Sequence, residues 1–189
     1  MKQAIVIVGS TCAGKTTLVQ AIRDAALDGV DIPRRYVTRA MRPGDIADEA
    51  SSLTADTDYF IHWTRTLAGH TERYAFARPA PGKLPVYSAN NAILDSVQPA
   101  GALADALIIG VVAPEDVRAQ RLHVRSPELC RDRPEEARAR LAERMPANVH
   151  RVIENHGEHE KRARQEIIEI VIGTLRAFEL QNDAESRSD

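Results

Sequence analysis

Long apolar runs, paired cysteines and a strong net charge are all absent from this sequence. Its only two cysteines, Cys12 and Cys130, have no C-x-x-C spacing, so we expect no structural disulfide and a reducing, cytoplasmic setting. No apolar run approaches the length of a membrane span, and Lys2 leads directly into a short apolar run rather than a signal peptide. The formal net charge of −2 gives no general attraction to nucleic acid. Neither a membrane nor a nucleic acid is therefore an expected partner.

Hydrophobic residues are numerous enough to form one substantial core. They make up 43% of the 189 residues, which favours a single domain. We place this domain at residues 1–180 and expect the polar stretch 181–189 to be a disordered tail. The sequence is compatible with a monomer or a homodimer.

An octapeptide near the N-terminus has the pattern of a phosphate-binding loop. Residues 9–16 read GSTCAGKT, which fits G-x-x-x-x-G-K-[ST] at every fixed position. The glycines let the backbone curl so that its N–H groups point at a triphosphate. Lys15 then reaches the β and γ phosphates, and the Thr16 hydroxyl is placed to bind Mg²⁺. We therefore predict ATP and Mg²⁺ as ligands, held by Gly9, Ser10, Thr11, Cys12, Ala13, Gly14, Lys15, Thr16 and Thr17.

The segments on either side of this loop strengthen the prediction. Residues 3–8 (QAIVIV) form an apolar, β-branched run typical of a strand buried on both faces. After Lys15, apolar residues recur at spacings of three and four, which predicts an amphipathic helix that closes near Gly29. The free N–H groups and the positive dipole end of that helix would lie directly beneath the phosphates.

Further along the chain, predicted strands and helices alternate. We expect strands at 35–38, 83–88, 106–112 and 149–153, and helices at 114–125, from 134 onward and at 158–179, with a polar stretch at 126–133. This order predicts an α/β fold of the P-loop NTPase type, with three α/β/α layers and a mostly parallel sheet. Residues 39–58 are too many for a plain connector, which indicates a functional loop or a small inserted lobe.

Several short motifs resemble those of the guanylate kinase family. They are residues 35–39 (RYVTR), 42–45 (RPGD), 58–60 (DYF), 140–141 (RL) and 152–157 (VIENHG), and they keep the family's order over about residues 3 to 175. The run at 35–39 resembles still more the ribose 1,5-bisphosphate phosphokinase branch of related sugar-phosphate kinases. The resemblance implies a kinase with a small acceptor-binding insertion, at about 38–80, and a helical lid, at about 122–140.

The resemblance also implies roles for individual residues. The acceptor would be bound by Arg39, Arg42, Tyr59, Tyr74 and Ser88. The catalytic residues would be Lys15, Arg125 and Arg140, because the lid arginines would stabilise the transferring phosphoryl group. Tyr59 has an alternative interpretation as a core aromatic, since Phe60 and Ile61 follow it.

The chain departs from the guanylate kinase pattern where that family recognises guanine. The segment 61–64 (IHWT) has no acidic counterpart, and the family's D-x-D is replaced at 88–91 by SANN. The second of these changes also leaves no Walker-B type carboxylate for Mg²⁺. We favour a nucleoside monophosphate as the acceptor, with ribose 1,5-bisphosphate as the alternative.

Two other classes of protein remain as alternatives. A nucleotide-dependent switch is disfavoured because the sequence has no N-K-x-D and no D-x-x-G motif. A non-catalytic guanylate kinase-like interaction module would have no need for the phosphate-binding loop. The kinase hypothesis therefore explains more of the sequence than either alternative.

Overall fold

Five parallel strands form the larger of two sheets, in the order β2-β7-β1-β8-β9. They are β2 (Val30–Asp31), β7 (Leu84–Ser88), β1 (Ala4–Val8), β8 (Ala106–Val112) and β9 (Arg151–Glu154). The computed structural model describes residues 2–38, 51–52, 59–96 and 103–186. All five residues of β1 are buried, as expected for the central strand of a parallel sheet.

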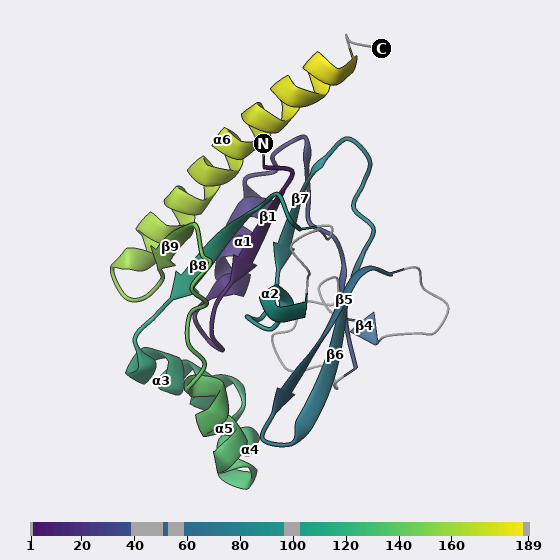
Figure 1. Ribbon diagram of the computed structural model, residues 1–189. Coiled ribbons are helices and arrows are strands. Elements are labelled where there is room, and N and C mark those ends of the chain that lie inside the picture. Colours follow the sequence, from purple (N-terminus) through teal and green to yellow (C-terminus); the bar gives the residue numbers. More distant parts are fainter. Residues whose placement is uncertain (1, 39–50, 53–58, 97–102, 187–189) are drawn as a thin grey trace.

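Two helices cover one face of this sheet. They are α1 (Lys15–Asp24) and α6 (His159–Ser186), and α6 crosses the sheet obliquely and projects beyond it (Figure 1). Ile5 and Ile7 from β1 pack in one cluster with Leu18 from α1 and with Ile167 and Val171 from α6. This apolar cluster fixes the start of α1 against the end of β1, where the glycine-rich loop lies.

A smaller sheet and a short helix cover the opposite face. The sheet has the order β4-β3-β6-β5, formed by β4 (Ser51–Ser52), β3 (Arg35–Val37), β6 (His70–Ala77) and β5 (Tyr59–Leu67). The helix is α2 (Ile93–Ser96), whose Ile93 packs with Val6, Trp63 and Phe76. The predicted α/β class with a mostly parallel sheet is confirmed. In the described residues, however, the third layer consists mainly of β-strands rather than long helices.

Strands β5 and β6 form an antiparallel hairpin that the sequence analysis did not predict. They are joined at Ala68 and Gly69, which both have positive φ, as a two-residue hairpin turn requires. Along β5, Ile61, Trp63 and Arg65 are buried, whereas the residues between them are exposed. This alternation is typical of a strand with one buried face, and it places an arginine on that face.

Three short helices form the end of the molecule nearest the tip of this hairpin (Figure 1). They are α3 (Glu115–Arg125), α4 (Pro127–Asp132) and α5 (Pro134–Leu141). No helix was predicted within the polar stretch at 126–133, but α4 occupies most of it. Pro127 and Pro134 stand at the first turns of α4 and α5, where a proline loses no hydrogen bond and its φ suits the helix.

Helix α6 extends further than its apolar pattern predicts. It continues to Ser186, so residues 181–186 are helical and not the disordered tail we expected; residues 187–189 lie outside the described part of the chain. Once a long helix has formed, each added residue gains a hydrogen bond without a new nucleation cost, so packing is not required to extend it. None of the described helices has both the length and the apolar character needed to cross a membrane.

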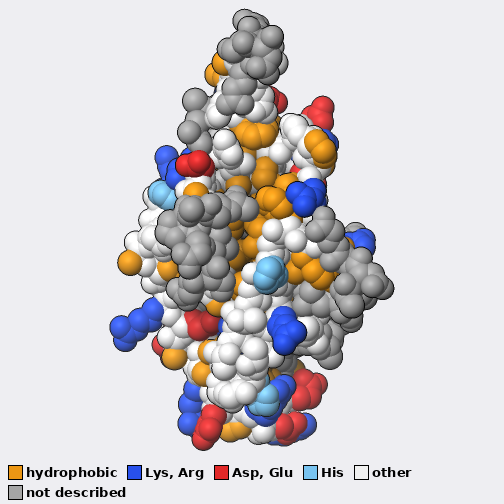
Figure 2. All heavy atoms as spheres, turned by 45° about the vertical axis from the view of Figure 1, so that its right-hand side comes forward, with side chains coloured by type: hydrophobic (Ala, Val, Ile, Leu, Met, Phe, Trp, Pro, Cys, Tyr) orange, Lys and Arg blue, Asp and Glu red, His pale blue; other side chains and the backbone are white. Residues whose placement is uncertain are grey.

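Charged side chains of both signs gather at the end of the molecule formed by the hairpin tip and α3–α5. On the face shown in Figure 2, blue and red side chains alternate at this end, and the exposed apolar side chains lie mainly toward the middle. The arginines of this region thus lie among carboxylates rather than in a patch of one sign. Their ion pairs therefore determine which of these arginines can bind a ligand.

The packing of α6 on α1 gives a prediction about stability. Ile167 is fully buried, so Ile167→Ala should lower the free energy of unfolding by about 2–5 kcal/mol, through lost burial and a residual cavity. Leu180 on the same helix is 70% exposed, and Leu180→Ala should change stability by less than about 0.5 kcal/mol. Chemical denaturation of the two variants measures both values. Equal losses would show that α6 does not pack as described.

Candidate functional site

The glycine-rich loop joins the end of β1 to the start of α1. Gly14, immediately before the helix, has a φ of +97°, a value that residues with a side chain rarely adopt. A Cβ at Gly14 would also collide with Nδ2 of Asn155, which donates a hydrogen bond to the Gly14 carbonyl at 3.0 Å. The loop is therefore held in one conformation, with its backbone packed against the residue that follows β9.

Lys15 begins the helix, and its ammonium group folds back over the loop. Nζ donates to the Gly9 carbonyl at 2.6 Å and to the Ser10 carbonyl at 3.0 Å. Burial lowers the pKa of Lys15 to about 7; Glu143 opposes this shift, whereas Arg35, Arg65 and Arg125 add to it. The ammonium group thus lies in a strongly cationic environment that a polyanionic ligand would neutralise.

The lowered pKa of Lys15 gives a test of the predicted ATP binding, which should be accompanied by proton uptake. A triphosphate on the loop would raise the pKa of Lys15, so the free protein would hold fewer protons than the complex at pH values between the two pKa values. At about pH 8 we expect an uptake of up to about one proton, falling toward about pH 6, where free Lys15 is already charged. Calorimetry of Mg-ATP binding in buffers of different ionisation enthalpy measures it. Proton release, or the same uptake in Lys15→Met, would contradict the assignment.

A polar pocket of about 290 Å³ opens beside the loop. Loop and helix residues line one wall, and the remaining walls come from β3, the hairpin, α3, α5, the start of α6 and Asn90, which is the second residue after β7. The basic residues that line it are Lys15, Arg35, Arg65, Arg121, Arg125 and Arg140; the acidic one is Glu160. Such an excess of cationic groups suits a ligand with several phosphates.

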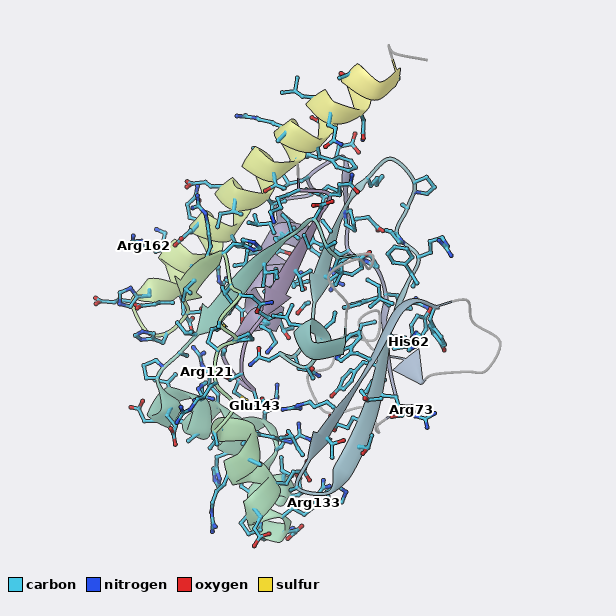
Figure 3. The ribbon with its side chains drawn as sticks, viewed as in Figure 1. His62, Arg73, Arg121, Arg133, Glu143 and Arg162 are labelled. Carbon is cyan, nitrogen blue, oxygen red and sulfur yellow. The ribbon has the colours of Figure 1, made fainter. Side chains whose placement is uncertain are left out.

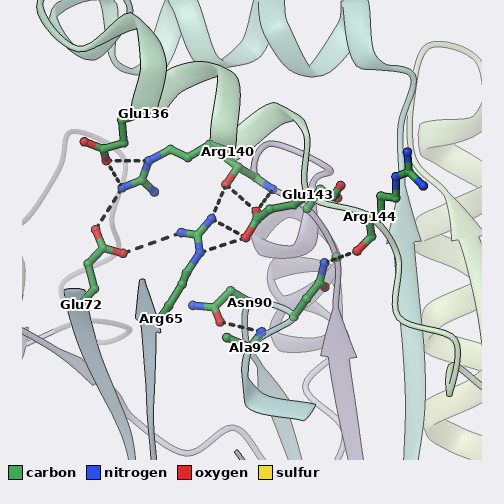
Figure 4. A network of polar contacts seen from close by, with 12 residues as sticks. Arg65, Glu72, Asn90, Ala92, Glu136, Arg140, Glu143 and Arg144 are labelled. Atoms are coloured by element: carbon green, nitrogen blue, oxygen red, sulfur yellow. Dashed lines mark hydrogen bonds and ion pairs between the residues drawn. The ribbon is translucent and has the colours of Figure 1, made fainter. Parts of the chain in front are cut away.

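A chain of ion pairs connects α5 to the hairpin across this pocket (Figure 4). Arg140 of α5 is buried and binds Glu136 at 2.6 Å and Glu72 of β6 at 3.0 Å. Arg65 of β5 binds Glu143 at 2.6 Å and approaches Glu72 at 3.7 Å. The pocket is thus closed on one side by side chains from two elements that lie far apart in the sequence.

Arg121 of α3 ties the other side of the pocket to the loop. Its guanidinium donates to the Asn155 carbonyl at 3.0 Å and to the Cys12 carbonyl at 3.3 Å, and it pairs with Glu160 of α6 at 2.7 Å. Figure 3 shows Arg121 and Glu143 toward the middle of the molecule, and Arg73 and His62 on the hairpin, away from α3–α5. The loop is therefore contacted by α3 and by the segment after β9 as well as by its own neighbours.

The structure brings together part of the predicted site. The predicted residues of the loop and the start of α1 that line the pocket are Thr11, Cys12, Gly14, Lys15, Thr16 and Thr17. The other predicted residues that line it are Tyr74, Arg125 and Arg140. Gly9, Ser10 and Ala13 belong to the loop but do not line the pocket. Tyr59 and Ser88 do not line it either: Tyr59 packs edge-on against Tyr36, and the Ser88 carbonyl accepts a hydrogen bond from Arg35. Arg39 and Arg42 lie outside the described residues.

Five charged residues of the site were not predicted as site residues. They are Arg35, Arg65, Arg121, Glu143 and Glu160. One of them left a signal in the sequence: Arg65 occupies an apolar position in the alternating pattern of β5, after Ile61 and Trp63. An arginine on the buried face of a strand requires a charged partner or a ligand. Arg35 stands in the 35–39 run that carries the family resemblance, but no role was assigned to it. Arg121, Glu143 and Glu160 lie on helices or loops that are rich in charge, so nothing distinguishes them from surface residues before the fold is known.

Comparison with known proteins supports the resemblance stated above. No family model matches the chain. The ribose 1,5-bisphosphate phosphokinase PhnN of Bradyrhizobium diazoefficiens is 28% identical over 137 residues, which cover 65% of this chain and 65% of that protein. The protein of the same name from Pseudofrankia inefficax is 28% identical over 166 residues, which cover 81% of this chain and 82% of that protein. The match thus spans less than two thirds of the first relative and about four fifths of the second.

A solved structure supports the fold. A guanylate kinase from Anaplasma phagocytophilum aligns with a TM-score of 0.53 at 14% identity, covering 93% of this chain and 86% of that chain. The predicted similarity to guanylate kinase-like P-loop kinases is therefore confirmed: the curated relatives are named as sugar-phosphate kinases, and the solved neighbour is a guanylate kinase.

Proposed function

We propose that this chain is an ATP-dependent kinase that transfers the γ-phosphoryl group to a small molecule already bearing phosphate. The observation that carries the proposal is the position of Lys15, on a phosphate-binding loop that opens into a pocket with five arginines. Phosphoryl transfer depends on holding donor and acceptor in line and on neutralising charge. A loop with arginines opposite it supplies both.

The residues of the loop fit Mg-ATP. The N–H groups of residues 13–16 lie at the start of α1, where backbone donors and the helix dipole favour phosphate oxygens. Lys15 would move from the Gly9 and Ser10 carbonyls onto the β and γ phosphates, and the Thr16 hydroxyl would bind Mg²⁺, which prefers oxygen ligands. The ion would neutralise charge on the phosphates.

For the acceptor, we favour ribose 1,5-bisphosphate over a nucleoside monophosphate. The indole of Trp63 stacks on Tyr74 and donates to Asn90, and Trp63 is 2% exposed, so it is not available to stack on a base. The Asn90 amide oxygen already accepts from Trp63 and Ala92, so Asn90 offers a ligand its N–H groups. Donors of this kind suit phosphate and sugar oxygens. The naming of the curated relatives agrees with this choice.

A nucleoside monophosphate is the second candidate. Tyr74 is the observation in its favour, because the resemblance to guanylate kinases places a phosphate-binding tyrosine there and the side chain does line the pocket. Its hydroxyl donates to Glu72, so a phosphate at this position would have to compete with that carboxylate. An acceptor with one phosphate would contact fewer of the six basic residues that line the pocket than an acceptor with two phosphates.

An acceptor screen tests the proposal. The release of ADP should rise strongly when ribose 1,5-bisphosphate is added with Mg-ATP, and less or not at all with GMP, AMP, CMP or UMP. If a nucleoside monophosphate were the sole acceptor phosphorylated, the proposal of kinase activity would stand and the proposed acceptor would be wrong. Steady ATP hydrolysis that no acceptor accelerates would favour a nucleotide-dependent switch and contradict the proposal.

A further inference from the structure

Arg65 is a buried arginine that contacts the phosphate-binding loop. It lies in the middle of β5, 6% exposed, and its Nη2 atom is 3.3 Å from Oγ1 of Thr11. Its main partner is Glu143, which it binds through Nε at 2.9 Å and through Nη2 at 2.6 Å. A guanidinium held in this way brings a permanent positive charge from the hairpin to the loop.

The Glu143 carboxylate occupies a position on the loop that suits a phosphate oxygen. Oε2 accepts from the Thr11 backbone N–H and from the Thr11 hydroxyl, both at 3.3 Å, while Oε1 accepts from Arg65. An anion thus lies between a loop amide and an arginine, the arrangement that binds phosphate at such loops. The Glu143 carbonyl separately accepts from the Ser10 hydroxyl at 2.7 Å. The side chain can therefore leave while the backbone stays attached to the loop.

In a complex with a triphosphate, this position would correspond to the outermost phosphate. The amides nearest α1 hold the inner phosphates, and the lysine of the loop extends toward the outer ones. In this structure, Lys15 points to the first residues of the loop, where its Nζ lies on the Gly9 and Ser10 carbonyls. Thr11 is the next residue, so its amide and Arg65 border the space into which the γ-phosphate would extend.

We propose that Arg65 is a further phosphate-binding residue, which contacts the γ-phosphate of ATP, and that Glu143 is the counter-ion this phosphate displaces. The proposal rests on the proposed function, because it requires a nucleotide on the loop. It adds a cation from the acceptor-binding sheet to the donor site, so Arg65 would touch the phosphoryl group that moves between the two substrates. Such a contact stabilises charge on that group.

A purely structural salt bridge is the competing explanation. In that case Arg65 and Glu143 would only join the hairpin to the loop, and removing either would weaken the fold without distinguishing ATP from ADP. A phosphate-binding role predicts effects of opposite sign: loss of Arg65 weakens ATP binding, whereas loss of the Glu143 charge strengthens it. ADP, which lacks the γ-phosphate, should be affected little by either change.

Titration calorimetry of the full chain with Mg-ATP and Mg-ADP separates the two explanations. Arg65→Gln should raise the Kd of ATP at least about tenfold, as expected for loss of a charge-assisted hydrogen bond, and that of ADP less than about twofold. Glu143→Gln, which keeps the shape of the side chain, should lower the Kd of ATP severalfold. Arg65→Lys should bind ATP with intermediate affinity. Arg73→Gln is the matched control, because Arg73 is an exposed arginine of the same hairpin.

The outcomes are distinguishable. Equal changes for ATP and ADP, or no change for ATP in Arg65→Gln, would overturn the role of Arg65 and leave the kinase proposal standing. If Arg65→Gln does not fold, Glu143→Gln and Arg65→Lys decide: failure of Glu143→Gln to tighten ATP binding overturns the proposal. A wild-type chain that binds neither nucleotide would overturn the proposed function, and the role of Arg65 with it.

Discussion

Lys15→Met should lower kcat by at least about 10²-fold and leave the fold intact. The ammonium group is the one basic group carried by the loop motif itself, and in the complex it would contact the phosphates whose charge changes during transfer. Its burial makes the charged form costly in the free protein, as the lowered pKa shows. The variant should therefore be at least as stable as the wild type at about pH 7, even though it is inactive.

The stability difference should depend on pH in a defined direction. Between about pH 7 and the ordinary lysine pKa, unfolded Lys15 holds a proton that the folded protein has lost, so the stability of the wild type rises with pH in this range. The advantage of Lys15→Met should therefore shrink as the pH is raised. Lys83→Met, at an exposed lysine, is the control and should change neither activity nor this profile. A kcat within about threefold of wild type for Lys15→Met would contradict the role of the loop.

Gly14→Ala should abolish nucleotide binding in the measurable range. An alanine at position 14 would have to keep the φ of +97°, which costs a residue with a Cβ about 1–2 kcal/mol. Its Cβ would also displace the Asn155 side chain, which holds the loop. Asn155 is 1% exposed and its backbone carbonyl also binds Arg121, so it has little room to move. The loop amides would then be misplaced by enough to lose the phosphates. Calorimetric titration with Mg-ATP measures the loss, and thermal unfolding measures the accompanying destabilisation.

Gly82→Ala is the matched control for this substitution. Gly82 also has a positive φ, of +72°, but a Cβ there would meet no atom within 4 Å. Gly82→Ala therefore introduces backbone strain without a steric collision. It should lower stability slightly and leave the affinity for ATP unchanged. If both variants bound ATP like the wild type, contact between Gly14 and Asn155 would not be what holds the loop.

The sequence alone predicted the strand, the glycine-rich loop and the helix at the N-terminus well, because these elements are local. Strand β1, the loop and α1 are consecutive in the chain, and each has its own signal: a β-branched run, paired glycines and an amphipathic period. The remaining walls of the pocket depend on contacts between distant segments. Arg65 and Glu143 are 78 residues apart in the chain, and nothing in either neighbourhood indicates the other.

The errors in secondary structure have specific causes. The hairpin of β5 and β6 was missed because its tip carries Ala68 and Gly69 rather than a common turn pair, although the alternation along β5 was readable. Helix α4 was not predicted because its composition is mostly polar, so the proline at its first turn was not recognised as a helix start. The end of α6 was placed too early because exposed polar residues extend a helix without an apolar pattern.

The central claim is that this chain moves the γ-phosphoryl group of ATP onto a small molecule that already carries phosphate. The most direct measurement follows the reaction by ³¹P NMR, with Mg-ATP and ribose 1,5-bisphosphate as substrates and Lys15→Met as the control. We expect the γ-phosphate signal to be replaced by signals of ADP and of a new phosphoanhydride on the sugar, in the wild type only. Conversion of the γ-phosphate to free inorganic phosphate, at a rate that neither this acceptor nor any nucleoside monophosphate changes, would contradict the claim.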